Sequence, residues 1–247
     1  MSRGLSCDKF HHSTGTQPEL TTTPDTTDPE ATLRESFRRL EEVESFHIDM
    51  DMTFEVGGGG FTIEMLMDMD MDYSLPDKAK GVASVTLLDE TTKLEVVSIG
   101  EDYYFRDSPS GRWEKEQTEA SAGGFFSLNN IKATLGFSSD ETEEVDPLQG
   151  TENIRFVGEE TVNGIPVWRI AGTINPSQLG DGYEDAAGVL SFDYWVGKDD
   201  LLIYQILMFG DVQFRDEDGT LVDSTMRIEG KISQYNEPVE IEAPSVR

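Results

Sequence analysis

The 247-residue sequence lacks the features that mark several common classes of protein. Cys7 is the only cysteine, so the chain cannot form an intrachain disulfide. It has 19 lysine and arginine residues against 49 aspartate and glutamate residues, a formal net charge of −30. Because phosphate backbones and anionic headgroups are bound by clustered basic side chains, this balance argues against nucleic acid and against docking on an anionic membrane surface.

Long apolar runs and catalytic motifs are also missing. No apolar run approaches the ~20 residues of a membrane-spanning helix, and no signal-peptide core precedes Cys7. There is no Gly-x-Ser-x-Gly elbow, no phosphate loop and no His/Cys metal cluster. Carboxylates are so numerous that no pair stands out as a glycosidase acid and nucleophile. We therefore expect a protein that is not an enzyme, with no catalytic residue, no metal and no cofactor.

The most informative stretch is residues 46–73, where side chains alternate strictly between apolar and acidic. Such alternation is typical of strands with one buried face, and the run Gly57–Gly60 permits the turn of a hairpin. Six of the nine methionines fall on the apolar face. The predicted buried face consists of Ile48, Met50, Met52, Phe54, Val56, Phe61, Ile63, Met65, Met67, Met69, Met71 and Tyr73.

This methionine-rich face has three interpretations. Methionine fills irregular gaps in an ordinary core, and it also lines surfaces that must adapt to apolar ligands of different shape. Thioethers are soft ligands for copper(I), but Met-x-Met pairs on a strand simply follow the pleat, which disfavours a metal site. A solid core and the wall of a ligand cavity both remain open.

The opposite face of the hairpin carries Asp49, Asp51, Asp68, Asp70 and Asp72, which we interpret as a solvated outer surface and not as a calcium site. His47 falls on this acidic face by parity, so we expect it to be exposed and not catalytic.

The rest of the chain predicts one α+β domain after a tether. Residues 1–28 are rich in Thr and Pro and should form a flexible tether, and residues 29–247 the domain. Asp28 as N-cap and Pro29 in the first turn begin an amphipathic helix of about four turns. A second short helix is expected around residues 126–135. Further strands are expected at 79–88, 92–99, 102–107, 111–116, 151–160, 165–174, 189–197, 201–214 and 221–235.

The order of these segments resembles a known superfamily. A tether and an amphipathic helix lead to SFHIDMDMTFE, followed by DYYFRDSPSGRWEK, FVGEETVNGIPVWRIAGTI, FDYWVGKDDLLIYQILM and NEPVEIEAP. This order is similar to that of the lipoprotein-carrier superfamily of LolA and the mycobacterial LppX/LprG-type lipoproteins, over about residues 30–243. The resemblance implies a strongly curved antiparallel half-barrel, a meander of about ten strands, with helices covering its concave face and an apolar cavity that holds acyl chains.

The resemblance also implies which residues line that cavity. Phe126, Leu128 and Ile131 would form a helical lid above it. The full set of expected lining residues is Phe37, Leu40, Met50, Met52, Phe54, Met65, Met67, Met69, Met71, Phe126, Leu128, Ile131 and Trp168.

Cys7 lies where the lipoprotein branch of the superfamily carries its acylated cysteine. A lipobox would place Leu three residues earlier, where this chain has Gly4, and the hydrophobic leader is missing. Either the true start lies further upstream, or the chain has been trimmed, or Cys7 is not acylated. The resemblance implies an extracytoplasmic protein anchored by lipid on the outer face of the cell membrane, with a secreted protein as the alternative.

The functional expectation is a monomeric, non-catalytic lipoprotein that binds lipid acyl chains, or the acyl groups of a lipoprotein, for transport or sensing. The alternative is a structural or interaction protein, with a solid half-barrel core and an acidic surface that binds a partner.

Overall fold

The computed structural model describes residues 28–58, 61–107, 111–116, 146–178, 186–215 and 220–246. The described residues form one α-helix, one short 3-10 helix and eleven strands. The elements are α1 (Pro29–Glu41), β1 (Ser45–Gly58), β2 (Phe61–Ser74), β3 (Lys78–Leu87), β4 (Glu90–Ile99), β5 (Asp102–Arg106), β6 (Glu114–Glu116), β7 (Thr151–Val162), β8 (Ile165–Ile174), η2 (Pro176–Gln178), β9 (Ala187–Gly197), β10 (Ile203–Arg215) and β11 (Leu221–Ser233).

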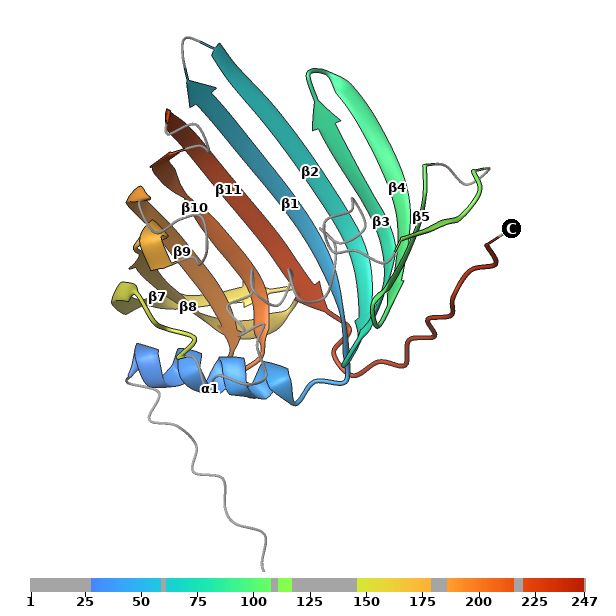
Figure 1. Cartoon of the computed structure of the whole chain (residues 1–247). Helices are drawn as coiled ribbons and strands as arrows, with labels where there is room; N and C mark the ends of the chain where they lie inside the picture. The colour runs from blue at the N-terminus through green and yellow to red at the C-terminus, as the bar shows by residue number, and fades with distance from the viewer. Residues whose placement is uncertain are drawn as a thin grey trace, which may run out of the picture.

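All eleven strands belong to one antiparallel sheet with the order β6-β5-β4-β3-β2-β1-β11-β10-β9-β8-β7. Figure 1 shows the strongly curved sheet. Its two edge strands, β6 and β7, are not paired with each other, so the barrel is open. The predicted antiparallel half-barrel is therefore confirmed, with eleven strands instead of about ten. No helix among the described residues is long and apolar enough to cross a membrane.

Neighbouring strands in the sheet are neighbours in sequence with one exception, the pairing of β1 with β11. These strands come from opposite ends of the chain, and they run antiparallel from His47 opposite Ser233 to Gly57 opposite Asp223. The pairing places the chain's first and last strands side by side in the middle of the sheet (Figure 1). The break in the meander then falls between β6 and β7, at the two edges.

Helix α1 begins where the sequence predicts. The Asp28 carboxylate accepts hydrogen bonds from the backbone N–H groups of Glu30 and Ala31, at 3.0 and 3.2 Å, and Pro29 fills the first position. The apolar side of the helix, with Leu33, Phe37 and Leu40, is buried. In Figure 1 the helix lies across one end of the half-barrel. We call this end of the sheet, where β1 begins, the base, and the end with the β1–β2 hairpin the tip.

Two hairpins follow directly from local sequence. Asn163 and Gly164 both have positive φ, 50° and 86°, and join β7 to β8 in the two-residue turn that Asn-Gly favours. The β1–β2 hairpin keeps an unbroken register from Ser45 opposite Ser74 to Gly58 opposite Phe61. The predicted pairing within residues 46–73 is therefore confirmed.

The prediction that helices cover the concave face is not confirmed. α1 packs its apolar side into the main core together with residues of β1, β2, β8, β9, β10 and β11. The second expected helix, around residues 126–135, lies outside the described residues. We call the face of the sheet that carries this core the inner face, and the opposite one the outer face.

Candidate functional site

The inner face collects the methionines of the hairpin into cross-strand pairs. Met50 lies opposite Met69, and Met52 lies opposite Met67. Unbranched thioether side chains in contact across a strand pair can repack at low cost. All eight methionines of the described residues lie on this face: Met50, Met52, Met65, Met67, Met69, Met71, Met208 and Met226.

Sequence reasoning missed two of these methionines. Met226 on β11 lies opposite Phe54, and Met208 on β10 lies opposite Ile228, which in turn lies opposite Met52. Each sits at an apolar position of an alternating strand. Nothing in the local sequence shows that β11 pairs with β1. Only the strand register therefore places Met208 and Met226 on the same face as the methionines of the hairpin.

At the base, the inner face is tightly filled. Met71 is 0% exposed, and it lies opposite Gly81 on β3. A Cβ atom at Gly81 would lie 2.7 Å from the Met71 sulfur, so the thioether occupies the space that a larger residue would need. Ala79 and Ala83 flank Gly81 on the same face. Large side chains on β2 thus fit over small ones on β3, which is how a dense core interdigitates.

Helix α1 closes the base. The Phe37 ring meets the edge of Tyr194 on β9 with centroids 5.6 Å apart. The Tyr73 hydroxyl is buried and has no hydrogen-bond partner among the described residues, and burial raises the pKa of this tyrosine. Seven of the predicted lining residues are buried in the core at this end and along the middle of the stripe: Phe37, Leu40, Met50, Met52, Met67, Met69 and Met71.

At the tip, the inner face is exposed. Val56 and Ile63, which lie opposite each other, are each 36% exposed, Phe61 is 62% exposed and Leu87 on β3 is 43% exposed. The prediction that the apolar face is buried along its whole length is therefore wrong for Val56, Phe61 and Ile63. In Figure 1 α1 lies across the base, and the strands continue well beyond it. We call Val56, Phe61, Ile63 and Leu87 the tip patch.

Three further predicted lining residues are half-buried. Phe54 and Met65 are half-buried and opposite each other, next to the tip patch. Trp168 on β8 is half-buried, with its ring centroid 6.3 Å from that of Phe156. The predicted lid residues Phe126, Leu128 and Ile131, and also Cys7, lie outside the described residues.

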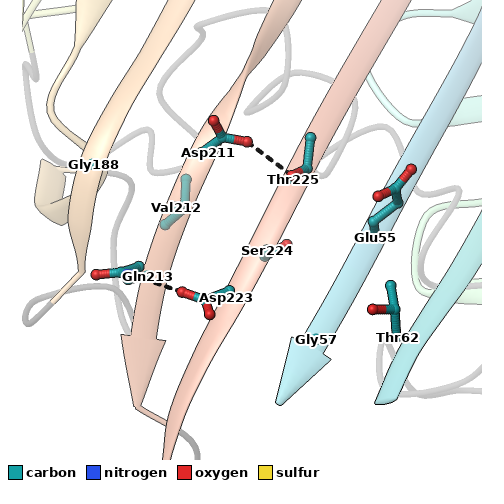
Figure 2. A pocket seen from close by; sticks show the side chains of 10 residues that line it. All are labelled: Glu55, Gly57, Thr62, Gly188, Asp211, Val212, Gln213, Asp223, Ser224 and Thr225. Carbon is teal, nitrogen blue, oxygen red and sulfur yellow. Dashed lines mark hydrogen bonds between the residues drawn. The ribbon is translucent and has the colours of Figure 1, made fainter. Parts of the chain in front are cut away.

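Two open hollows are lined by polar parts of the sheet. The larger, of about 440 Å³, lies near the tip of β1, β2, β10 and β11, with Glu55, Asp211 and Asp223 in its wall (Figure 2). Its polar side chains already pair, since Thr225 donates a hydrogen bond to Asp211 at 2.8 Å. The second, of about 360 Å³, lies beside Asn175. Neither contains a methionine, so neither is the cavity that the methionine face predicts.

The chain resembles solved structures over nearly its whole described length. No protein-family model and no curated protein matches the sequence. The lipoprotein LppX of Mycobacterium tuberculosis is 18% identical with a TM-score of 0.53, over 87% of this chain and 98% of LppX. LprF of Mycobacterium bovis is 12% identical with a TM-score of 0.54, over 88% of this chain and 97% of LprF. The chain has the LppX fold. The predicted resemblance is confirmed at the level of fold, which is what identities of this size can show.

In this LppX-like sheet the outer face is a ladder of carboxylates. In the β1–β2 register Asp49 lies opposite Asp70, and Asp51 lies opposite Asp68. Directly opposed like charges destabilise a strand pair unless they are neutralised. Partial burial, a hydrogen bond shared with Asp68 and the charge of that carboxylate raise the pKa of Asp51.

His47 lies on the outer face, as predicted, but the expectation that it is exposed is wrong. Its side chain is only 16% exposed, because the neighbouring carboxylates of β1 and β2 surround the ring. Partial burial opposes charging of the ring, but the hydrogen bond to Asp72 and the charges of Asp49 and Asp70 outweigh it, so the pKa of His47 is raised.

Proposed function

We propose that this protein is a non-catalytic carrier or sensor that binds lipid acyl chains on the inner face of its half-barrel. Two features support the proposal. The fold is that of LppX, which is a lipoprotein. The inner face carries all eight methionines of the described residues, the side chains best able to adapt to chains of different shape.

The observation that carries the proposal is the tip patch. Soluble proteins seldom leave large apolar side chains together in water unless something binds there. Val56, Phe61 and Ile63 are exposed on the same face as the buried methionines, and half-buried Phe54 and Met65 connect them to the core. An acyl chain laid along this face would continue the apolar packing of the base toward the tip.

The energetics are sufficient for tight binding. Removing one CH₂ group from water contributes about 0.8 kcal/mol, so a chain of ~16 carbons supplies on the order of 10 kcal/mol before the costs of association and ordering. Because this term is not electrostatic, binding should depend only weakly on salt.

The predicted lining residues, together with Met208 and Met226, divide into two roles under this proposal. Phe54, Met65, Trp168, Met208 and Met226 are half-buried and packed against the core, and would contact the chain. The fully buried methionines and the α1 residues would form the floor beneath them. Phe126, Leu128 and Ile131 keep their proposed role as a lid.

Extraction of the purified protein with organic solvent, followed by mass spectrometry, tests the proposal. We expect co-purified lipid, released only on extraction, and its replacement by an added fluorescent fatty acid. Absence of lipid, together with failure to bind a fatty acid, an alkyl ester and a long-chain alkane at micromolar concentration, would contradict it.

We also propose that residues 1–28 tether the domain of residues 29–247 outside the cytoplasm, through an acyl anchor on Cys7. The lipoprotein nature of LppX supports the anchor. Feeding the source organism an alkyne-labelled fatty acid and probing the purified protein tests it. Label in the native chain and not in a Cys7→Ala chain is expected. Equal label in both would contradict an anchor at Cys7.

A solid core with an acidic, partner-binding surface is the second candidate, and the dense base favours it. Met67 is buried, so in a solid core Met67→Trp should destabilise by about 1–3 kcal/mol through overpacking. If the tryptophan instead leaves stability unchanged and blocks fatty-acid binding, the side chain borders ligand space, and the carrier proposal is favoured. Met65→Trp, at a half-buried position of the same strand, is the matched comparison.

A further inference from the structure

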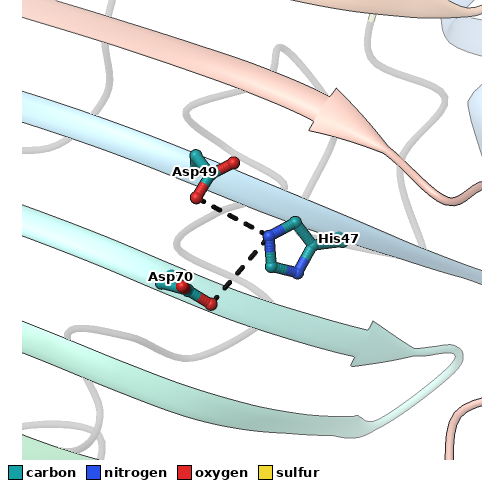
Figure 3. A group of neighbouring side chains, drawn as sticks. All are labelled: His47, Asp49 and Asp70. Atoms are coloured by element: carbon teal, nitrogen blue, oxygen red, sulfur yellow. Dashed lines mark ion pairs between the residues drawn. The ribbon is translucent and has the colours of Figure 1, made fainter.

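The outer face holds a cluster that lipid binding does not use, made of His47, Asp49 and Asp70 (Figure 3). Asp49 follows His47 by two residues on β1, so both side chains leave the same face of the strand. Asp70 lies opposite Asp49 on β2. The three side chains come from two adjacent strands, and their ligand atoms all lie within 4.8 Å of one another.

The orientation of the imidazole is fixed by a fourth residue. His47 Nδ1 lies 2.9 Å from Asp72 Oδ1, and since an ionised carboxylate only accepts, Nδ1–H is the donor. Lys80 lies 3.9 Å from the other oxygen of Asp72. The neutral ring then carries its lone pair on Nε2. A carboxylate that holds Nδ1–H in this way is the usual support of a metal-bound histidine.

The lone pair of Nε2 points into a gap between two carboxylates. Nε2 lies 3.6 Å from Asp49 Oδ1 and 3.9 Å from Asp70 Oδ1, both too long for hydrogen bonds. Two ligands held at about 2.0–2.2 Å by one tetrahedral zinc ion lie roughly 3.3–3.6 Å apart. Both Nε2 distances are therefore close to the ligand separation around a bound divalent cation. The two carboxylate oxygens lie within 4.8 Å of each other and would have to approach by about 1 Å to share the ion.

The gap between Nε2 and the two carboxylates carries net negative charge. Among the described residues, Asp49 and Asp70 form ion pairs only with His47, and they face each other across the strand pair. Lys231 lies opposite Asp49 on β11 but makes no ion pair with it within the described part of the chain. The next rung, Asp51 and Asp68, has the same opposed carboxylates but no imidazole. The Asp51–Asp68 pair therefore serves as a control for the cluster, because it offers oxygen ligands but no nitrogen ligand.

We propose that His47, Asp49 and Asp70 bind one divalent transition-metal cation of the zinc class, with water completing its coordination. The nitrogen ligand selects against calcium and magnesium, which prefer all-oxygen sites. The ion would cross-link β1 to β2 on the outer face and neutralise their opposed carboxylates. Because the site lies on the face opposite to the methionines, the proposal does not depend on lipid binding.

Calorimetric titration of the full metal-stripped chain with ZnCl₂ at about pH 8 tests the proposal. We expect one zinc ion per chain with an affinity in the micromolar range, and a rise in melting temperature on binding. Asp70→Asn and His47→Ala should each weaken binding at least tenfold, as loss of a ligand does. Asp68→Asn, on the neighbouring rung, should leave the affinity within about twofold, since it removes no ligand.

A second measurement identifies the nitrogen ligand. Co²⁺ in place of zinc should give visible absorption bands that His47→Ala removes and Asp68→Asn retains. A chain with Cys7→Ser, His11→Ala and His12→Ala should bind zinc as the native chain does, because these residues are not ligands. Circular dichroism and urea unfolding of each variant, without metal, show whether it folds.

Three outcomes would overturn the proposal. One is absence of zinc binding by a folded chain. Another is zinc binding that the Cys7/His11/His12 variant loses. The third is binding that His47→Ala retains or that calcium displaces at equal concentration, which would show adventitious binding to carboxylates only.

Discussion

The two ends of the methionine face follow the same alternating sequence pattern and yet have opposite environments. At the base, Met71 is fully buried over Gly81, and α1 closes the sheet. At the tip, Val56 and Ile63 continue the same stripe on the same strands but lie in water. The difference arises outside the hairpin, since the hairpin's own alternation is the same at both ends.

The contrast shows that two properties of a strand are independent: which side chains share a face, and whether that face is buried. Alternation determines which side chains share a face, because successive residues point to opposite sides. Whether that face is covered depends on which other element packs on it. In this protein the base behaves as a core, and the tip patch has the character of a binding surface.

The largest expected effect comes from truncating the stripe at each end. Met71→Ala removes a fully buried side chain and should lower the free energy of unfolding by about 2–4 kcal/mol, the usual cost of a cavity in a core. Ile63→Ala, at the exposed end, should cost less than about 1 kcal/mol. Urea unfolding of both variants measures the difference. Equal losses would show that the tip is as well packed as the base.

Alanine substitutions at two glycines test the same difference in packing between the base and the tip. An alanine Cβ at Gly81 would lie 2.1 Å from the Asp70 carbonyl oxygen and 2.7 Å from the Met71 sulfur, so Gly81→Ala should cost about 1–3 kcal/mol. At Gly57, near the tip, the added atom would meet its neighbours at an ordinary 3.5 Å, and Gly57→Ala should change stability by less than about 0.5 kcal/mol. Thermal unfolding of the two variants checks this order. A tolerated alanine at position 81 would contradict the dense packing inferred for the base.

The tip patch can be tested for lipid binding with a matched pair of substitutions. Ile63 on the inner face and Leu66 on the outer face of β2 are 36% and 37% exposed. If the acyl chain crosses the tip patch, Ile63→Asn should weaken fatty-acid binding by about five- to tenfold, since the contact of one apolar side chain is lost. Leu66→Asn should leave the affinity unchanged. Fluorescent fatty-acid titration measures both, and equal effects would remove the distinction between the faces.

The smallest effect concerns the helix that covers the base. The Glu35 carboxylate accepts hydrogen bonds from Arg38 at 2.6 Å and Arg39 at 2.8 Å, and these pairs lower the pKa of Glu35 to about 2. Glu35→Gln should therefore destabilise by about 0.5–1 kcal/mol at neutral pH, as partly exposed helix ion pairs do.

The pH dependence of this effect has a definite sign. Because the folded-state pKa lies below the unfolded value of 4.5, the stabilisation is present above pH 4.5 and is lost as the pH falls toward 2. Unfolding curves of native and Glu35→Gln chains should therefore converge at the acid end. Glu41→Gln, at an exposed position of the same helix, is the control. If the difference in unfolding free energy between the native and Glu35→Gln chains stays constant down to pH 2, the ion pairs are not its cause.

Local sequence predicted much of the fold. Asp28 and Pro29 marked the start of α1, Asn163-Gly164 marked a hairpin, and alternation marked most of the strands within a few residues. The strand predicted at 111–116 is shorter, since β6 begins at Glu114. These features depend on residues close together in the chain, where capping, turn chemistry and side-chain parity act.

Less of the candidate site could be predicted, because it depends on contacts between distant segments. Met226 joins the stripe only through the pairing of β11 with β1, and Met208 only through β10 beyond it. The outer face shows the same limit. Parity placed His47 and Asp49 on one side, but the gap between Nε2 and Asp70 depends on the register of β2.

The sequence by itself determined the two-faced character of the hairpin, with thioethers on one side and carboxylates on the other, since the pleat of a strand leaves no other arrangement. Tertiary structure alone decided that β1 and β11 meet in the middle of the sheet, and that the methionine face is buried at the base and exposed at the tip. The physical reason is that backbone hydrogen bonds between strands are nearly the same for any partner. The choice of partner and of cover is therefore made by the packing of the whole chain.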